Sequence, residues 1–300
     1  MAYLQLPTHR LHYRLDGTEG RPWLTFCNSL GTDLHMWDVQ LEAFAPHYRI
    51  LRYDRRGHGY SETPPGPYSV ADLGQDVLAL WDALEIAQSD FCGLSIGGLT
   101  GQWLGLQAPQ RLRRLVVCAT AQKIGSAATW ETRIEQVRSE GLPTLIDATL
   151  QRWFTPEFAT SHAQRLDMIA AAFVSTSPAG YIACCQAVAD ADFRGALDGL
   201  SLPLLALAGD DDPVARRLTC ARSPMPRRMV ITPRCPAATS ATWSHRPRST
   251  TRCSAFFRAS ELSHLARTPH ARRRTLSSRH ACTPPRPWRC VCRSRAGRAQ

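Results

Sequence analysis

The sequence predicts an α/β fold: a mostly parallel sheet with helices on both faces and a helical cap. Short apolar runs alternate with helical patterns from the N-terminus to about residue 120. This alternation is typical of a parallel sheet covered by helices on both sides. Residues 125–193 then show helical patterns only, before one further apolar run at residues 204–208. Of the 300 residues, 44% are hydrophobic and 20% are charged, as in globular proteins.

The sheet is expected to begin with a pair of strands at residues 3–6 and 11–15, with Asp16 and Gly17 as turn residues. The later strands are short and largely apolar, as expected where both faces of a sheet are buried. They cover residues 23–27, 48–53, 89–94 and 112–119. Between them, apolar residues at i, i+3 and i+4 predict helices, which cover residues 36–45, 70–84 and 97–107.

The helical stretch interrupts the α/β order and is expected to form several amphipathic helices that cap the active site. Its apolar positions are Trp130, Ile134, Val137, Leu145, Leu150, Trp153 and Phe154. We therefore divide the chain into four parts. They are a core over residues 1–124, a cap over 125–197, a return to the core over 198–214, and a tail over 215–300.

The positive charge of the chain comes entirely from this tail. Residues 215–300 hold 20 arginines and one acidic residue, a net charge of +19, whereas residues 1–214 hold 16 basic and 24 acidic residues, a net charge of −8. A strongly basic protein ordinarily suggests a nucleic-acid partner. The tail has no regular spacing of aromatic residues, so nucleic-acid binding is the disfavoured alternative.

The cysteines and the apolar runs indicate the cellular compartment of the protein. Five of the eleven cysteines lie in apolar stretches before the tail, where we expect buried free thiols: Cys27, Cys92, Cys118, Cys184 and Cys185. The N-terminus has no continuous apolar export signal, and no apolar run reaches the roughly 20 residues that span a bilayer. We expect a cytoplasmic protein with no membrane partner. We also expect no metal site, because no four cysteines or histidines have zinc-ligand spacing.

The segment from Gly93 to Gly97 carries the chemistry. It follows an expected strand and opens an expected helix, with Ser95 at its centre. This is the context of the Gly-x-Ser-x-Gly nucleophile elbow, in which glycines allow close approach of strand and helix while the serine hydroxyl projects above the sheet. The motif predicts Ser95 as a catalytic nucleophile.

Two backbone N–H groups should stabilise the oxyanion formed by attack on a carbonyl. One belongs to Ile96, the residue after the nucleophile. The other belongs to the loop after the third strand, residues 27–32 (CNSLGT). In this loop Ser29 is the first candidate and Leu30 the second.

A carboxylate should follow the strand at residues 204–208, where it would orient a histidine base. The segment there is Gly-Asp-Asp-Asp over residues 209–212. Gly-x-x-Asp spacing selects Asp212, although three adjacent aspartates leave the choice open and a solvated acidic turn is the alternative.

Residues 54–61 (DRRGHGYS) match an Asp-x-Arg-Gly-x-Gly-x-Ser pattern that shapes a loop in folds of this kind. His58 lies in this loop, before the nucleophile in the chain. We interpret it as structural, not as the catalytic base.

Residues 1–214 resemble the bacterial 3-oxoadipate enol-lactonases of the α/β-hydrolase family. The resemblance rests on residues 28–38 (NSLGTDLHMWD), 91–104 (FCGLSIGGLTGQWL) and 152–156 (RWFTP). It implies a serine hydrolase that opens 3-oxoadipate enol-lactone to 3-oxoadipate through an acyl-enzyme on Ser95, in the β-ketoadipate breakdown of protocatechuate and catechol, without a cofactor. The alternative is another capped hydrolase, such as a carboxylesterase or a C–C bond hydrolase.

The substrate implied by this resemblance is a small lactone that carries a carboxylate. A cap cation would hold that carboxylate, and the sequence leaves Arg133 and Arg152 as alternatives. Trp130 and Trp153 are the candidate aromatic contacts in the cap. The sequence does not indicate an oligomeric state.

The resemblance also requires a histidine base near the C-terminus, and no matching segment is found. His245, His264, His270 and His280 lie among arginine, serine and proline, with no apolar strand before them. Reading the gene one base earlier permits Leu-Pro-Gly-Gly-His within residues 234–243. We therefore interpret residues 215–300 as an out-of-frame product, expect them to be disordered or non-native, and expect the chain as written to be impaired.

Overall fold

One eight-stranded sheet runs through the part of the chain that the computed structural model describes, residues 1–208 and 229–231. The strands lie in the order β1-β2-β4-β3-β5-β6-β7-β8, and β2 is antiparallel to both of its neighbours, β1 and β4, whereas all other neighbouring strands are parallel. They are β1 (Ala2–Gln5), β2 (Arg10–Gly17), β3 (Trp23–Cys27), β4 (Arg49–Tyr53), β5 (Ser89–Leu94), β6 (Leu112–Cys118), β7 (Leu204–Leu207) and β8 (Met229–Ile231). This mostly parallel sheet confirms the predicted α/β fold.

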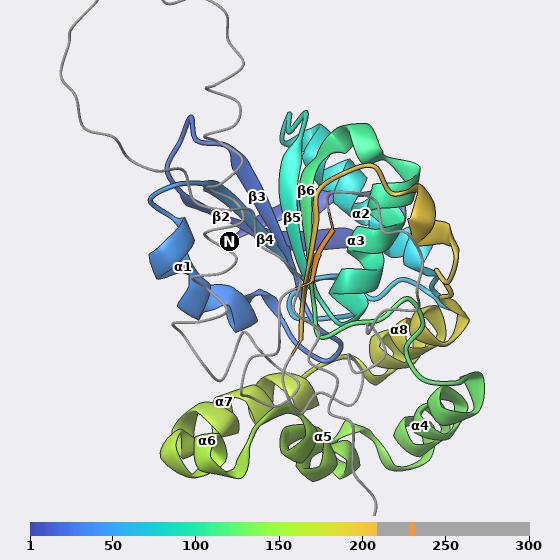
Figure 1. The fold of residues 1–300 in the computed structure, drawn as a ribbon. Coiled ribbons are helices and arrows are strands. Elements are labelled where there is room, and N and C mark those ends of the chain that lie inside the picture. The colour runs from blue at the N-terminus through green and yellow to red at the C-terminus, as the bar shows by residue number, and fades with distance from the viewer. Residues whose placement is uncertain (209–228, 232–300) are drawn as a thin grey trace, which may run out of the picture.

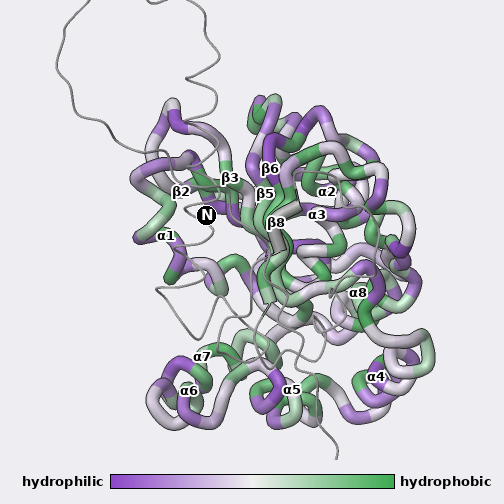
Figure 2. The backbone as a smooth tube through the Cα atoms, in the orientation of Figure 1, coloured by the Kyte–Doolittle hydropathy of each residue, from purple (hydrophilic) through white to green (hydrophobic). Residues whose placement is uncertain are grey.

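Helices cover both faces of this sheet (Figure 1). Those of the core are α1 (Asp38–Phe44), α2 (Val70–Ala83) and α3 (Ile96–Gln107), with α1 on one face and α2 and α3 on the other. Each face has its own apolar cluster. Trp37 and Phe44 belong to the cluster on the α1 side, and Trp81 and Phe91 to the cluster on the α2 side. Figure 2 accordingly shows the central strands as largely apolar between more polar outer segments.

The predicted insertion is helical and lies at one end of the sheet (Figure 1). Its helices are α4 (Ala127–Glu140), α5 (Ile146–Trp153), α6 (Pro156–Ser161), α7 (Ala163–Val174) and α8 (Pro178–Asp190). A Cβ atom on Gly57 would overlap the backbone of Gly180 in α8, and one on Gly31 would overlap the ring of Phe173 in α7. The cap therefore rests directly on the loops that follow β3 and β4. The boundaries of the four parts stay predictions.

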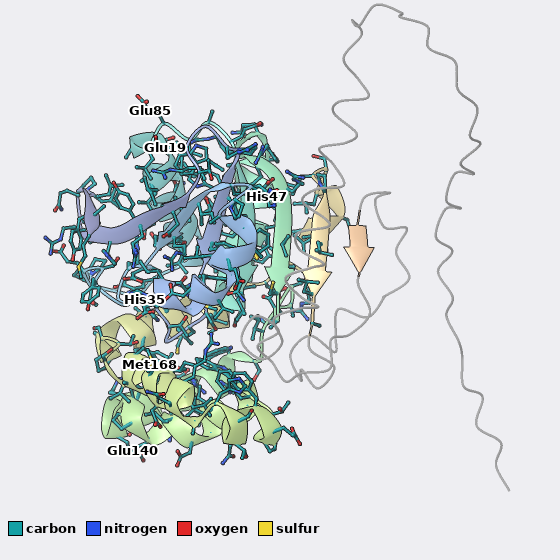
Figure 3. All side chains as sticks on the ribbon, turned by 90° about the vertical axis from the view of Figure 1, so that its left-hand side faces the viewer. Glu19, His35, His47, Glu85, Glu140 and Met168 are labelled. Carbon is teal, nitrogen blue, oxygen red and sulfur yellow. The ribbon has the colours of Figure 1, made fainter. Side chains whose placement is uncertain are left out.

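The two ends of the sheet differ in what lies beyond them. In Figure 3, His35 marks the end of the sheet that faces the cap, whereas Glu19 and Glu85 mark the opposite end. Since β5, β6 and β7 are parallel, all three end on the cap side. Ligand sites of open α/β sheets lie at this edge.

The helix predicted over residues 36–45 is present but shorter, as α1 over Asp38–Phe44. A 3-10 turn, η1 (Leu34–Trp37), comes first, and α1 begins only at Asp38. Leu34 is fixed by two long-range bonds, since its N–H donates to Asp54 Oδ1 (2.7 Å) and its carbonyl accepts from Arg52 Nη1 (3.1 Å). These contacts hold the start of the turn to β4.

The predicted turn at Asp16 and Gly17 is wrong. Both residues belong to β2, where Gly17 pairs with Arg49 of β4. Gly17 has a φ of +79°, and a Cβ atom there would overlap the carbonyl oxygen of Tyr48. Glycine is needed here because the backbone is left-handed and another chain segment lies against it.

The tail is described only at β8, which pairs in parallel with β7. This strand departs from the expectation of a wholly non-native tail, and its sequence, Met-Val-Ile, is a short β-favouring apolar run. The other predictions for residues 209–300, including Asp212, lie outside the described residues. In the described part of the chain no single helix is long and apolar enough to cross a membrane, and only the bent pair α7–α8 passes by length and composition.

Candidate active site

Ser95 lies at the strained junction between β5 and α3. Its backbone has φ +56° and ψ −115°, and its side chain is half-buried. A Cβ atom on Gly93 would overlap the carbonyl of Gly97, and one on Gly97 would overlap the carbonyls of Cys27 and Asn28. The glycines of the motif are therefore required by the close approach of strand, helix and the loop after β3.

Hydrogen bonds on both sides hold this strained residue. The N–H of Ser95 donates to the Cys118 carbonyl (2.9 Å), and its own carbonyl accepts from Leu99 N–H (3.1 Å) and Thr120 Oγ1 (2.9 Å). A positive φ outside glycine costs of order 1–3 kcal/mol and persists only where its surroundings impose it. The buried Thr120 was missed from sequence, although its place at the end of β6 is on the same edge as Ser95.

The two oxyanion candidates of the loop after β3 differ in their hydrogen bonds. The N–H of Ser29 donates to Met36 Sδ (3.2 Å), so it is occupied. The N–H groups of Leu30 and Ile96 have no partner among the described residues. Ile96 keeps its role as a candidate donor, and Leu30, not Ser29, is the better second candidate.

The acid and the base are not brought to Ser95 within the described residues. The chain leaves β7 at Leu207, on the same edge as Ser95, and the Leu207 carbonyl accepts from Ala119 N–H (2.9 Å). Asp212 lies outside the described residues. Among residues 1–208 and 229–231, no histidine is hydrogen-bonded to Ser95.

His58 has a structural environment, in agreement with its interpretation from sequence. Its Nε2 accepts from Gly31 N–H (3.0 Å), which leaves the proton on Nδ1, 3.4 Å from the Arg56 carbonyl. Burial, and then the nearby charge of Arg55, lower the pKa of His58 to about 3. Both ring nitrogens of this neutral imidazole are engaged, so it is no candidate for the base.

In the cap, Arg133 and Trp153 contact Tyr181 and Phe173, two rings that lie against the loop after β3. Arg133 Nε donates to Tyr181 Oη (2.8 Å), and the Trp153 ring packs against Phe173 (6.1 Å between centroids). Tyr181 and Phe173 are the rings that a Cβ atom on Gly31 would meet. Trp130 Nε1 donates to a backbone carbonyl (2.7 Å), and Arg152 is exposed. Burial raises the pKa of Tyr181 well above its usual value, so its hydroxyl stays protonated and accepts from Arg133.

The cysteines before the tail are buried thiols. All five before the tail are free and buried, as predicted. Burial raises the pKa of Cys184 and of Cys185 to about 12, which keeps both thiols unreactive near neutral pH. Within the described ranges no three His, Cys, Asp or Glu side chains are grouped to hold a metal ion.

A serine on a strained strand-to-helix turn, with a helical cap at the same end of the sheet and two backbone N–H groups that have no partner within residues 1–208, defines a capped hydrolase of the nucleophile-elbow class. The family described as alpha/beta hydrolase fold matches residues 22–224. The chain belongs to the α/β-hydrolase fold family.

Its relatives within this family include enol-lactonases. The chain is 45% identical to 3-oxoadipate enol-lactonase 2 of Acinetobacter baylyi and 39% identical to 3-oxoadipate enol-lactonase 1 of the same organism. Each match covers 204 residues, 68% of this chain and 76% of the relative. The solved enol-lactonase from Burkholderia xenovorans LB400 is 38% identical with a TM-score of 0.81, covering 85% of this chain and 99% of that one. The resemblance predicted from sequence is confirmed, and the chain is a hydrolase.

Proposed function

We propose that this hydrolase opens 3-oxoadipate enol-lactone to 3-oxoadipate with Ser95 as its nucleophile. The observation that carries the proposal is the strained Ser95 elbow, with the N–H groups of Leu30 and Ile96 unpartnered among the residues that the structure describes, in a chain 45% identical to an enol-lactonase. The role in β-ketoadipate breakdown and the cytoplasmic location are parts of the same proposal.

The chemistry follows from these groups. Ser95 Oγ adds to the lactone carbonyl, and the oxyanion accepts hydrogen bonds from Leu30 and Ile96. The ring C–O bond then breaks and the enolate leaves as an easy leaving group, taking up a proton as it becomes the ketone. Water cleaves the ester on Ser95 and releases the second carboxylate. No cofactor enters any step.

Arg133 is the proposed partner of the substrate carboxylate. Its guanidinium is half-buried and donates to two neutral hydroxyls, Tyr181 Oη (2.8 Å) and Thr149 Oγ1 (3.3 Å). No carboxylate contacts Arg133 among the described residues. A partly desolvated guanidinium without an acidic partner is suited to binding an anion through charge-assisted hydrogen bonds. Trp153 would contact the apolar part of the ring.

The acid and the base of this reaction are expected after β7, in the part of the chain that begins at residue 209. We propose Asp212 as the acid and propose that the tail as written lacks the histidine base. Loss of a triad member leaves roughly 10³- to 10⁴-fold catalysis over water, from the oxyanion donors and binding. The chain as written should therefore retain residual hydrolysis that depends on Ser95.

The test compares the chain as written with a chain whose reading frame is restored after Val214, each with its Ser95→Ala control. The expected result is a rise in kcat for enol-lactone of about 10⁴-fold or more on restoration, abolished by Ser95→Ala. A restored, folded protein that cleaves p-nitrophenyl acetate but not the lactone would instead support the carboxylesterase alternative and defeat the substrate assignment.

A second substitution tests the substrate carboxylate. Arg133→Gln should raise KM for the enol-lactone about tenfold and leave KM for the uncharged p-nitrophenyl acetate unchanged. The exposed Arg152→Gln is the matched control and should change neither. Equal effects on both substrates would show that Arg133 supports the cap and does not bind the carboxylate.

A further inference from the structure

Three side chains of the loop after β4 form hydrogen bonds with the backbone of the loop that holds the oxyanion donor. We call residues 28–34 the oxyanion loop. Arg55 Nη2 donates to the carbonyl of Asn28, and the Leu34 N–H donates to Asp54 Oδ1 (2.7 Å). Between these two contacts, His58 Nε2 accepts from the Gly31 N–H (3.0 Å). Asp54, Arg55 and His58 are each no more than 2% exposed, so these contacts are shielded from water.

These contacts fix the orientation of successive peptide planes. Because a trans peptide is planar, its C=O and N–H point in opposite directions, and holding one fixes the other. In the Asn28–Ser29 peptide, Arg55 holds the carbonyl and Met36 Sδ accepts the N–H (3.2 Å) on the other side. In the Leu30–Gly31 peptide, His58 holds the N–H.

The peptide between them, Ser29–Leu30, is held by its carbonyl alone. Thr32 Oγ1 donates to the Ser29 carbonyl (2.9 Å), so the Leu30 N–H must point away from Thr32. Of the three consecutive peptides, this is the one whose N–H has no partner among the described residues. The loop is thus held so that a single N–H remains available.

Burying the charge of Arg55 at this place is energetically unfavourable, which is an argument that its position matters. Its Nε and Nη1 atoms are buried and have no hydrogen-bond partner among the described residues, and no carboxylate there pairs with it. A buried charge without an opposite charge is destabilising. A purely structural contact to the Asn28 carbonyl would be made at lower cost by a neutral donor.

We propose that Arg55 and His58 are positioning residues that lock the oxyanion loop so that the Leu30 N–H is presented to the substrate oxyanion. This inference rests on the proposed function, since it assigns those residues to the Ser95 reaction. The proposal assigns a role at the site to residues 54–61, which take no direct part in the reaction. Neither residue touches the reacting atoms.

The test uses the full chain and two variants of His58. His58→Leu removes the acceptor for Gly31 N–H, and His58→Gln keeps an acceptor close to the position of Nε2. For His58→Leu we expect hydrogen exchange at the Gly31 amide at least about 10²-fold faster and kcat for p-nitrophenyl acetate lower by about 10- to 100-fold. KM should stay within about threefold, and His58→Gln should restore most of both effects.

The control is Arg113→Gln, at the other end of the sheet, where Arg113 bonds Asp90 (2.9 Å). It should lower stability while leaving Gly31 exchange and kcat as in the parent. Unchanged Gly31 exchange in His58→Leu, or faster exchange with an unchanged kcat, would overturn the positioning role. Failure of the proposed function has a separate signature: Ser95→Ala would hydrolyse the ester at the parent rate while Gly31 exchange still responded to His58→Leu.

Discussion

Two buried arginines at opposite ends of the sheet have different partners. Near the start of β6, Arg114 donates through Nε and Nη2 to the two oxygens of Asp90 in β5, each at 2.9 Å, and Arg113 adds a further bond. At the cap end, Arg55 donates to the carbonyl of Asn28 and has no carboxylate partner among the described residues. Both residues are at most 6% exposed.

The difference shows which buried charge supports the fold and which supports the site. In the Arg114–Asp90 pair, mutual attraction offsets the desolvation of both charges, and removing one partner leaves the other buried without this compensation. Arg55 has no such compensation, so its free-energy contribution to folding is small or unfavourable. Its effect is on the orientation of the Asn28 peptide, and thus on the oxyanion loop.

The largest expected effect in this comparison is on stability at the Asp90 end. Arg114→Met should lower the free energy of unfolding by about 3 kcal/mol, since the buried Asp90 loses its two bonds from Arg114. Arg55→Met should change it by about 1 kcal/mol or less, yet lower kcat. Urea unfolding together with kcat per folded molecule checks both. A loss of about 3 kcal/mol in Arg55→Met with kcat unchanged would reverse the roles assigned to the two ends.

A smaller effect is expected from two buried threonines, one at each end. Thr120 Oγ1 donates to the Ser95 carbonyl (2.9 Å), whereas Thr25 Oγ1 accepts from Trp81 Nε1 (2.9 Å) and contacts Ser89. Thr120→Val should lower kcat about tenfold, because the strained Ser95 backbone loses a bond. Thr25→Val should cost about 1 kcal/mol of stability and leave kcat unchanged. Equal kcat in both variants would remove Thr120 from the support of the elbow.

Local patterns explain why much of the fold and the nucleophile could be predicted. The strands at residues 23–27 and 89–94 were predicted with both ends correct, because each is a short, largely apolar stretch beside polar or turn residues. The elbow at Ser95 is equally local, since its glycines and its serine are neighbours in the chain. These elements could be predicted because residues that are neighbours in the chain determine them.

The choice between Ser29 and Leu30 could not be made in that way. It depends on which way a peptide plane faces, and that is decided by Met36, Thr32 and Arg55 through folding. The boundary between η1 and α1 depends likewise on contacts from β4. Sequence spacing indicates which residues share a helix or strand. It does not indicate which residue of another element forms a hydrogen bond with a given backbone N–H or C=O group.

The smallest expected effect is the contribution of His58 to the pH dependence of the free energy of unfolding. Its folded pKa of about 3 lies below the ordinary value of 6.5, so the unfolded chain binds the proton that the folded chain excludes. Stability from this group is therefore fully present above pH 6.5 and is lost as the pH falls toward 3. Between pH 7.5 and 5.5 the loss is about 1.4 kcal/mol.

This loss is measured by urea unfolding at the two pH values, in the parent and in His58→Gln. All other titrating groups are common to both proteins, so the difference between their pH dependences isolates His58. The parent should lose about 1.4 kcal/mol more than the variant over this interval. An identical pH dependence would mean that His58 takes up a proton in the folded chain. An imidazolium cannot accept from the Gly31 N–H, so that outcome would also remove His58 from the lock on the oxyanion loop.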